Sequence, residues 1–201
     1  MALTLSQRKR LAIIEAAIVE FRLNGFQTSS MDAVAARADV SKRTVYNHFP
    51  SKEALFEELV RQLIDVGRRA TEYQFDGAKP LRVQLLEFAQ QELKLLSDLR
   101  FLDLSRITMA EAMISPERAK LVLEDVSEQE SHFERWVADA VKSGFLQTAN
   151  PATAARQFLG LIKSLAFWPQ MLTGQAIPNA EQAEQIANDA ATMFLARYGL
   201  K

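Results

Sequence analysis

Residues 28–52, TSSMDAVAARADVSKRTVYNHFPSK, decide the fold of this chain. The hydroxyls of residues 28–30 can cap a short helix, and Ser41 can cap a second one. Pro50 ends the second helix, because proline disfavours helical geometry at the residue before it. Two short helices joined by the turn Asp39-Val40-Ser41 form a helix-turn-helix, whose second helix can enter the major groove of DNA.

The second short helix carries side chains suited to nucleic acid. Residues 42–44 fall in its first turn, where a recognition helix meets base edges. Hydrogen-bond donors farther along this helix can reach phosphates, and free N–H groups at the starts of helices can bind anions. The predicted DNA-contacting residues are Ser30, Lys42, Arg43, Thr44, Tyr46, Asn47, His48 and Lys52.

Several of these side chains have a structural alternative. Tyr46 and Phe49 can pack in the core of a three-helix unit; we favour the core for Phe49 and DNA for Tyr46. His48 can instead interact with the dipole at the helix C-terminus, an alternative that stays open. Lys42 and Arg43 can be an ordinary solvated pair, but their place in the first turn favours DNA contact.

The charge of the chain is unevenly distributed. The whole sequence of 201 residues has a formal net charge of −1, which by itself argues against a polyanionic partner. Residues 1–52, however, hold eight basic and four acidic side chains, for a net charge of +4. Residues 53–201 hold 16 basic and 21 acidic side chains, for a net charge of −5. The basic character is therefore confined to the segment with the helix-turn-helix.

Apolar residues recur with helical spacing along almost the whole chain. In the first segment Leu11, Ile14, Ile18 and Phe21 form one apolar stripe, and similar stripes continue to Tyr198. No strand is predicted. The pattern indicates an all-α protein of about nine helices, with a DNA-binding domain at residues 1–52 and a helical bundle at residues 53–201.

Composition also bears on the chemistry of the chain. The absence of cysteine excludes thiolate chemistry and cysteine-ligated zinc. No apolar run is long enough to span a membrane, so we expect a soluble cytoplasmic protein with no membrane partner. His48 and His132 are far apart and no HExxH motif occurs, so we expect neither an enzyme nor a bound metal or cofactor.

At the helix-turn-helix the chain resembles the TetR family of bacterial transcriptional repressors. The resemblance covers about residues 8–60 and rests on Gly25-Phe26-Gln27-Thr28, Ala38-Asp39-Val40-Ser41, the Tyr46-x-x-Phe49 pair and Ser51-Lys52-x-x-Leu55. Elsewhere it rests on the number and length of the helices. Asp39 is a departure, because many members have glycine there.

The resemblance implies a three-helix DNA-binding domain, a C-terminal ligand-binding and dimerisation domain, and repression relieved by a small molecule. By position, it also implies base contacts for Lys42, Arg43, Thr44 and Asn47, and phosphate contacts for Tyr46, His48 and Lys52. The alternative is a DNA-binding adaptor that needs no ligand and acts through a partner protein.

The last two predicted helices indicate an oligomer independently of the resemblance. Residues 158–172, FLGLIKSLAFWPQML, are apolar on nearly every side, so this helix has two faces to bury. The final helix carries small residues that permit close helix approach, namely Ala180, Ala183, Ala187, Ala190 and Ala191. We predict a homodimer through residues 151–198 that binds a pseudo-palindromic operator on double-stranded DNA. The alternative is a central helix buried within a monomer.

The ligand site is placed by the resemblance alone, among the middle helices at about residues 55–170. Each candidate can equally be ordinary core or, for the polar ones, part of a salt bridge or an exposed face. The predicted residues are Phe88, Phe101, Arg106, Met109, Met113, Phe133, Trp136, Phe167 and Trp168, with Met171, Glu111 and His132 as further candidates. The helix that begins at Lys52 is the expected lever between ligand and DNA.

Overall fold

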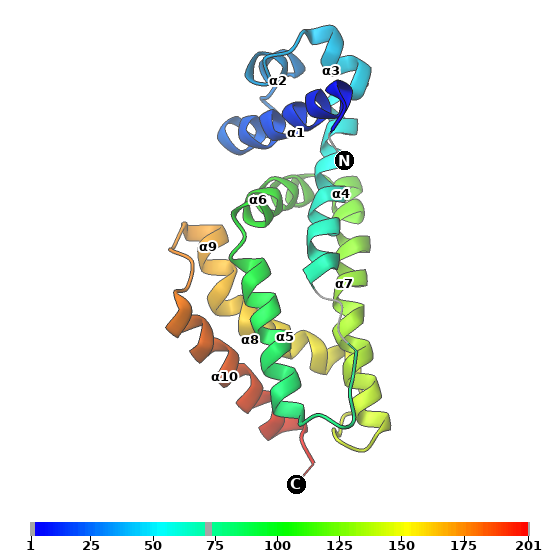
Figure 1. The fold of residues 1–201 in the computed structure, drawn as a ribbon, viewed down its shortest axis with the longest axis vertical. Coiled ribbons are helices and arrows are strands. Elements are labelled where there is room, and N and C mark those ends of the chain that lie inside the picture. Colours follow the sequence, from blue (N-terminus) through cyan, green and yellow to red (C-terminus); the bar gives the residue numbers. More distant parts are fainter. Residues whose placement is uncertain (1–2, 71–73, 201) are drawn as a thin grey trace. The chain divides into compact units, whose positions relative to one another are not determined.

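The computed structural model describes residues 3–70 and 74–200, apart from the side chains at 68–70 and 123–131. Within that part of the chain every regular element is an α-helix, which confirms the predicted all-α fold, and Leu146 and Gly199 form an isolated antiparallel bridge. The helices, labelled in Figure 1, are α1 (Leu5–Asn24), α2 (Met31–Arg37), α3 (Lys42–His48), α4 (Lys52–Ala70), α5 (Leu81–Leu96), α6 (Leu99–Ile114), α7 (Pro116–Lys142), α8 (Pro151–Ala166), α9 (Trp168–Thr173) and α10 (Ala180–Tyr198).

The chain forms two compact units. The first comprises Met1–Leu63 with Asp103–Leu123, and the second comprises Ile64–Leu102 with Glu124–Lys201. Helices α4, α6 and α7 each contribute residues to both units. The first unit thus holds more than the 52 residues of the predicted DNA-binding domain; that domain boundary stays a prediction.

Helix caps and a small apolar core build the first unit. The Thr4 side chain accepts a hydrogen bond from the Gln7 N–H to start α1, and Gly25 ends that helix at a φ of 77°, where a side chain would be strained. Helices α1, α2 and α3 pack together, as Figure 1 shows. Ile14, Val34 and Val45 are fully buried among them.

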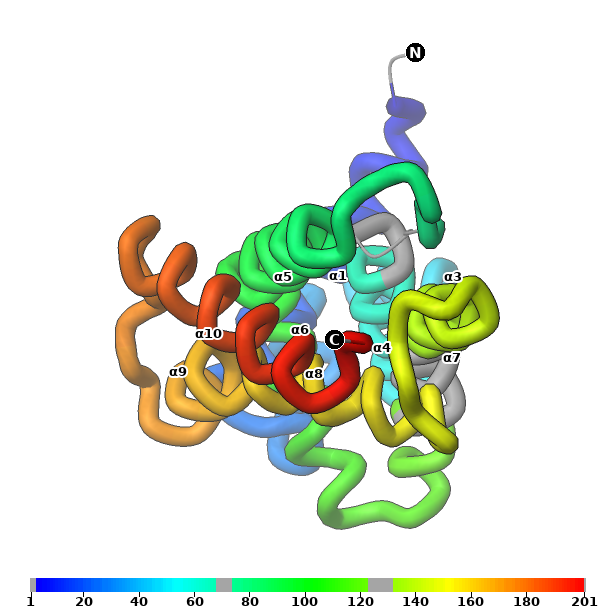
Figure 2. Tube along the Cα trace, turned by 90° about the horizontal axis from the view of Figure 1, so that it is seen from below, coloured from blue at the N-terminus to red at the C-terminus, as the bar shows by residue number. Residues whose placement is uncertain are grey.

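The second unit is organised around α5, α8 and α10, which pack against one another (Figure 2). Its centre is an aromatic cluster of α5, α7, α8 and α10 side chains. The Phe88 and Phe133 rings stack with centroids 4.1 Å apart, and Phe158 lies 4.9 Å from Phe133. Stacked and edge-on rings at these separations add to the free energy gained from burial alone.

The structure corrects one predicted helix. Residues 158–172, treated above as part of one helix, are divided between α8 and α9, so the described residues hold ten helices where about nine were predicted. Phe167 separates them with φ −130° and ψ −59°. Pro169 lies in the first turn of α9, where a proline is tolerated because the N–H groups of a first turn have no helical partner.

Candidate nucleic-acid interface

The helix-turn-helix has the local geometry that the sequence predicts. Ser30 accepts a hydrogen bond from the Ala33 N–H at 3.1 Å, and Ser41 accepts one from the Thr44 N–H at the same distance. These two caps fix the starts of α2 and α3. Asp39 in the intervening turn has a φ of 51°, in the left-handed region that glycine, asparagine and aspartate tolerate best. The departure from glycine at this position is therefore compatible with the turn.

Helix α3 buries one side and exposes the other. Val45 has no exposed surface and Phe49, just after the helix, is 3% exposed, so the core placement of Phe49 is confirmed. Tyr46 is 42% exposed, and the three polar residues Lys42, Arg43 and Asn47 are exposed as well. The outward side of α3 is thus polar, cationic and aromatic, a combination that can meet both base edges and phosphates.

The remaining predicted contacts lie at the edges of this surface. Ser30 is exposed at the start of α2, and Thr44 is half-buried. The Thr44 hydroxyl lies 2.8 Å from the Ser41 hydroxyl. His48 is half-buried in the last turn of α3, where its dipole and phosphate roles both remain predictions.

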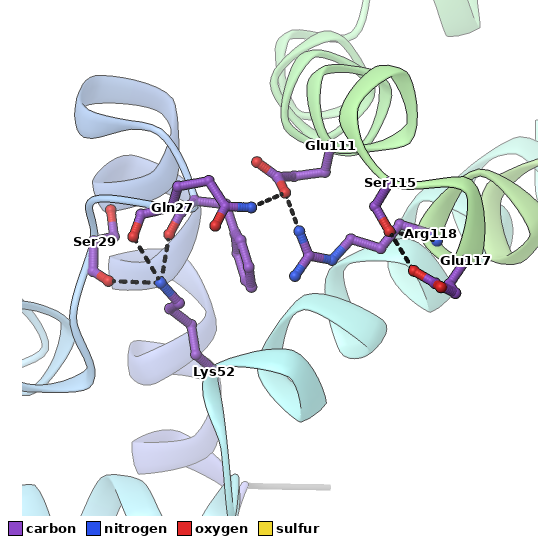
Figure 3. A network of polar contacts seen from close by, with 8 residues as sticks. Gln27, Ser29, Lys52, Glu111, Ser115, Glu117 and Arg118 are labelled. Carbon is purple, nitrogen blue, oxygen red and sulfur yellow. Dashed lines mark hydrogen bonds and ion pairs between the residues drawn. The ribbon is translucent and has the colours of Figure 1, made fainter.

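Lys52 has partners that the sequence did not indicate. Its Nζ donates to the carbonyl oxygens of Phe26 at 2.7 Å, Gln27 at 3.1 Å and Ser29 at 3.0 Å (Figure 3). An ammonium group has three N–H donors, so these bonds use all of them. Lys52 therefore holds the loop between α1 and α2, and its predicted phosphate contact would require it to leave these carbonyls.

Four of the eight cations of the first 52 residues form ion pairs within the first unit. Arg10 lies 2.8 Å from Glu58, Arg37 lies 3.0 Å from Glu20, and Arg22 lies 3.6 Å from Asp103. Lys42 pairs with Asp32 at 2.9 Å. Among the described residues, by contrast, nothing pairs with Arg8, Lys9 or Arg43. The excess positive charge that is free to meet DNA therefore lies at the start of α1 and in the first turn of α3.

A buried carboxylate holds the loop between α1 and α2 from a second side. Gln27 Nε2 donates to Glu111 Oε2 at 2.8 Å, and the Arg118 guanidinium pairs with the same oxygen (Figure 3). The Glu111 side chain is 5% exposed. The ring centroid of Phe26 lies 4.4 Å from Arg118 Cζ and 4.5 Å from Lys52 Nζ. Contacts from α4, α6 and α7 thus determine the position of the loop that leads into α2.

The predicted effector residues fall into both compact units. Phe88, Phe133 and Trp136 are buried in the aromatic cluster of the second unit, and the Trp136 indole donates to Gln84 Oε1 at 3.1 Å. Phe101 and Phe167 are also buried there, with ring centroids 6.3 Å apart, whereas Trp168 is 42% exposed. The aromatic packing is that of a core, and a ligand-lining role for these residues stays a prediction.

The other candidates lie in the first unit or on α7. Arg106 pairs with Asp103 at 3.3 Å, Met109 is half-buried and Met113 is 77% exposed. Glu111 belongs to the polar network above, and His132 is half-buried on α7. The sequence could not separate these settings, because apolar and charged residues at helical spacing look alike in core, pocket and surface.

Two hollows on the surface of the second unit are lined by described residues. One, of about 410 Å³, lies between α8 and α10 and includes Gly160, Leu161, Met193 and Phe194 in its lining. The other, of about 350 Å³, lies between α5 and α10 and includes Lys94 and Glu184. None of the nine predicted effector residues lines either hollow.

Neither a membrane span nor a metal cluster is found in the part of the chain that the structure describes. No helix there has the length and apolar character needed to cross a bilayer. No group of three or more His, Cys, Asp or Glu side chains there is arranged to hold a metal ion.

Comparison with known proteins shows which family the chain resembles in sequence and in structure. Residues 13–59 match the family described as bacterial regulatory proteins of the tetR family, and residues 83–200 match the C-terminal domain of the AefR-like transcriptional repressors. A crystal structure of a TetR family regulator from Pseudomonas syringae pv. tomato str. DC3000 is 41% identical with a TM-score of 0.86, covering 98% of this chain and 100% of that one.

Two relatives with lower sequence identity are also described as regulators. The flavonoid-responsive regulator FrrA is 29% identical with a TM-score of 0.75, over 96% of this chain and 98% of that one. The uncharacterised HTH-type regulator YhgD of Bacillus subtilis (strain 168) is 26% identical over 80% of this chain and 83% of its own length. The chain belongs to the TetR family of transcriptional regulators, with a helix-turn-helix DNA-binding domain at its N-terminus.

Proposed function

We propose that this regulator is a homodimeric repressor that binds a pseudo-palindromic operator and leaves it when a small molecule binds. The observation that carries the proposal is the outward side of α3, where Arg43 and Asn47 are exposed and Arg43 has no ion-pair partner among the described residues. Arginine and asparagine are the side chains that pair bidentately with guanine and adenine in the major groove. The match of residues 83–200 to AefR-like repressors supports repression over activation.

In the DNA complex we assign base contacts to Arg43, Thr44 and Asn47, and not to Lys42, because Lys42 pairs with Asp32. Tyr46, His48 and Ser30 flank them and contact phosphates, together with the exposed cations Arg8 and Lys9 of α1. Lys52 contributes indirectly, by holding the carbonyls of the loop between α1 and α2.

The dimer forms through α8 and α10. Leu165 and Met193 are each 56% exposed, and the hollow between these helices is lined largely by apolar side chains. Gly160 has open space where a side chain would begin, so a partner helix can approach the α8 backbone closely. An isologous contact of two such helix pairs makes a four-helix interface and places two recognition helices on one operator.

Sedimentation equilibrium tests the dimer. The native protein should have the mass of two chains, and Leu165→Glu should shift it to one chain because a carboxylate is buried at the contact. Leu23→Glu is the matched control, since Leu23 is 60% exposed on α1, away from α8 and α10 in the sequence. A native protein with the mass of one chain at micromolar concentration rules out the dimer.

Release by an effector requires that the effector bind more tightly to a conformation whose recognition helices do not fit the operator. The supporting observation is that α4, α6 and α7 each contribute residues to both compact units. A ligand that moves any of these helices in the second unit therefore acts on an element of the first. The flavonoid-responsive relative FrrA supports a small aromatic effector.

The experiment that tests the function is selection of DNA fragments by the purified protein, followed by titration of the complex with a panel of flavonoids. The proposal expects an inverted repeat among the selected fragments, and at least one compound that weakens its binding tenfold or more. Selected fragments without two-fold symmetry contradict a dimeric operator. An operator complex insensitive to broader metabolite panels as well contradicts release by a ligand and favours the adaptor.

A further inference from the structure

An ion pair links the two helices of the helix-turn-helix on their exposed side. Lys42 Nζ, at the start of α3, lies 2.9 Å from Asp32 Oδ1 and 3.0 Å from Oδ2. Asp32 lies in the first turn of α2, and the two side chains are 62% and 61% exposed. The same ammonium lies 6.0 Å from the centre of the Tyr46 ring. The first cation of the recognition helix is therefore held by groups of its own domain.

Arg43, the residue after Lys42, differs from Lys42 in its ion pairing. Arg43 is exposed in the same turn, and the described residues give it no ion-pair partner. The hydrogen bond and the charge of Asp32 raise the pKa of Lys42 above its ordinary value of 10.5, so Lys42 stays protonated. At neutral pH, the Asp32–Lys42 pair consequently presents no net charge to DNA, whereas Arg43 presents a full positive charge.

A lysine on this surface strengthens binding to any DNA sequence. Each phosphate that a cation neutralises steepens the dependence of log affinity on log salt by about 0.9, and this gain requires no particular base sequence. A phosphate contact positions the protein but carries no sequence information. Base contacts by Arg43 act on the operator alone.

We propose that Asp32 is a specificity-determining positioning residue, which acts by holding the Lys42 ammonium in an internal pair and so withholding one cation from the phosphate backbone. This inference rests on the assignment of α3 as the recognition helix. Asp32 lowers affinity for random DNA, both by occupying Lys42 and by placing a negative charge near the phosphates. The operator complex is affected less, because base contacts by Arg43 and Asn47 fix the position of α3 and leave a released Lys42 ammonium less freedom to reach a phosphate.

Asp32→Asn tests the inference by binding titrations on a random-sequence duplex over a range of salt concentrations. We expect the salt slope to steepen by about one unit and random-DNA affinity to rise several-fold at about 0.1 M salt. The ratio of operator to random affinity should fall. Circular dichroism before each titration verifies that the variant folds.

Asp39→Asn is the matched control. It makes the same change of charge in the same motif, Asp39 is exposed, and asparagine tolerates its φ of 51°. We expect Asp39→Asn to leave the salt slope within about a quarter of a unit of the native value. The double variant Asp32→Asn with Lys42→Gln should lose the added slope, because the released cation is gone.

An unchanged or shallower slope for Asp32→Asn overturns the inference, as does an equal effect of Asp39→Asn. Retention of the steeper slope in the double variant also overturns it, because Lys42 would then not be the released cation. If α3 is not the recognition helix, Arg43→Ala should leave operator binding intact, and this result distinguishes that error from an error in the role of Asp32. If Arg43→Ala weakens operator binding and Asp32→Asn leaves the slope unchanged, only the role of Asp32 is wrong.

Discussion

The two compact units are stabilised in different ways. In the first, aromatic rings meet cations as well as one another, and buried carboxylates meet arginines: Phe26 lies against Lys52 and Arg118, and Glu111 joins Arg118 to Gln27. In the second, aromatic rings meet one another, as in the stack of Phe88 on Phe133. Polar contacts depend on direction and charge, whereas apolar packing depends on volume. The first unit should therefore respond more strongly than the second to charge changes and to pH, and the second should respond more strongly to loss of side-chain volume.

The largest expected effect is the removal of a central ring from the second unit. Phe133 is 1% exposed and stacks on Phe88 and Trp136, so Phe133→Ala should lower the free energy of unfolding by about 3–5 kcal/mol. Urea titration followed by circular dichroism measures it. Phe145→Ala is the control, because Phe145 is 39% exposed, and should cost about 1 kcal/mol or less. Equal costs would show that the aromatic cluster is not the core of the unit.

The next effect tests the polar network of the first unit. Arg118→Gln leaves the Glu111 carboxylate, 5% exposed, without its cation and should lower the free energy of unfolding by about 2–3 kcal/mol. Arg61→Gln is the control, because it removes the ion pair of Glu58 with an arginine that is 64% exposed. It should lower the free energy of unfolding by less than about 1 kcal/mol. A cost for Arg118→Gln no larger than that of the control would mean that the network does not hold the loop.

A smaller effect separates two roles of Lys52. Lys52→Met removes the donors for three carbonyls, so we expect unfolding to become easier by about 1–2 kcal/mol while the salt slope of DNA binding changes little. Lys9→Met, which removes an exposed cation of α1, should leave stability unchanged. If Lys52→Met instead leaves stability intact and flattens the slope by about one unit, the phosphate contact predicted from sequence is the dominant role.

The smallest expected effect depends on pH. Burial opposes ionisation of Glu58, but hydrogen bonds from Arg10 and Gln62 and the charges of Arg10 and Arg61 outweigh it and lower the pKa of Glu58 below 4.5. A carboxyl whose pKa is lower in the folded state stabilises the fold above its unfolded pKa, and this contribution is lost as the pH falls through the folded value.

Glu58→Gln should therefore be less stable than the native protein at pH 7 by about 1 kcal/mol. The gap should close as the pH falls below 4.5 and through the lowered pKa. Denaturation midpoints at a series of pH values measure the gap, with exposed Glu57→Gln as the control. A gap that stays constant down to acid pH would assign the cost to packing and not to the charge.

The comparison of the two units also explains what the sequence could predict. Helix starts at Ser30 and Ser41 were predictable because a cap acts within three residues of itself. The helix-turn-helix was predictable for the same reason. The boundary between α8 and α9 at Phe167 was not predictable in the same way, because a proline such as Pro169 can end one helix and can also start another.

Contacts between residues that are far apart in the chain could not be predicted from the sequence. Lys52 reaches carbonyls 23 to 26 residues away, and Gln27 meets Glu111 across 84 residues. Backbone carbonyls carry no signature in a sequence, so nothing marked Lys52 as a loop anchor. In the second unit, Phe133 and Trp168 have the same apolar character, yet one is 1% and the other 42% exposed. Hydrophobicity predicts burial for such residues without separating core, pocket and interface.

The most direct test of the central claim is the affinity of Arg43→Ala for the selected operator and for a random duplex of the same length. If the exposed, unpaired Arg43 of α3 reads a base edge, operator binding should weaken by about 1–3 kcal/mol, with relaxed preference at one position of each half-site. Binding to the random duplex should change far less. Unchanged operator affinity, or an equal loss on both duplexes, would contradict the assignment of α3 as the element that reads DNA sequence.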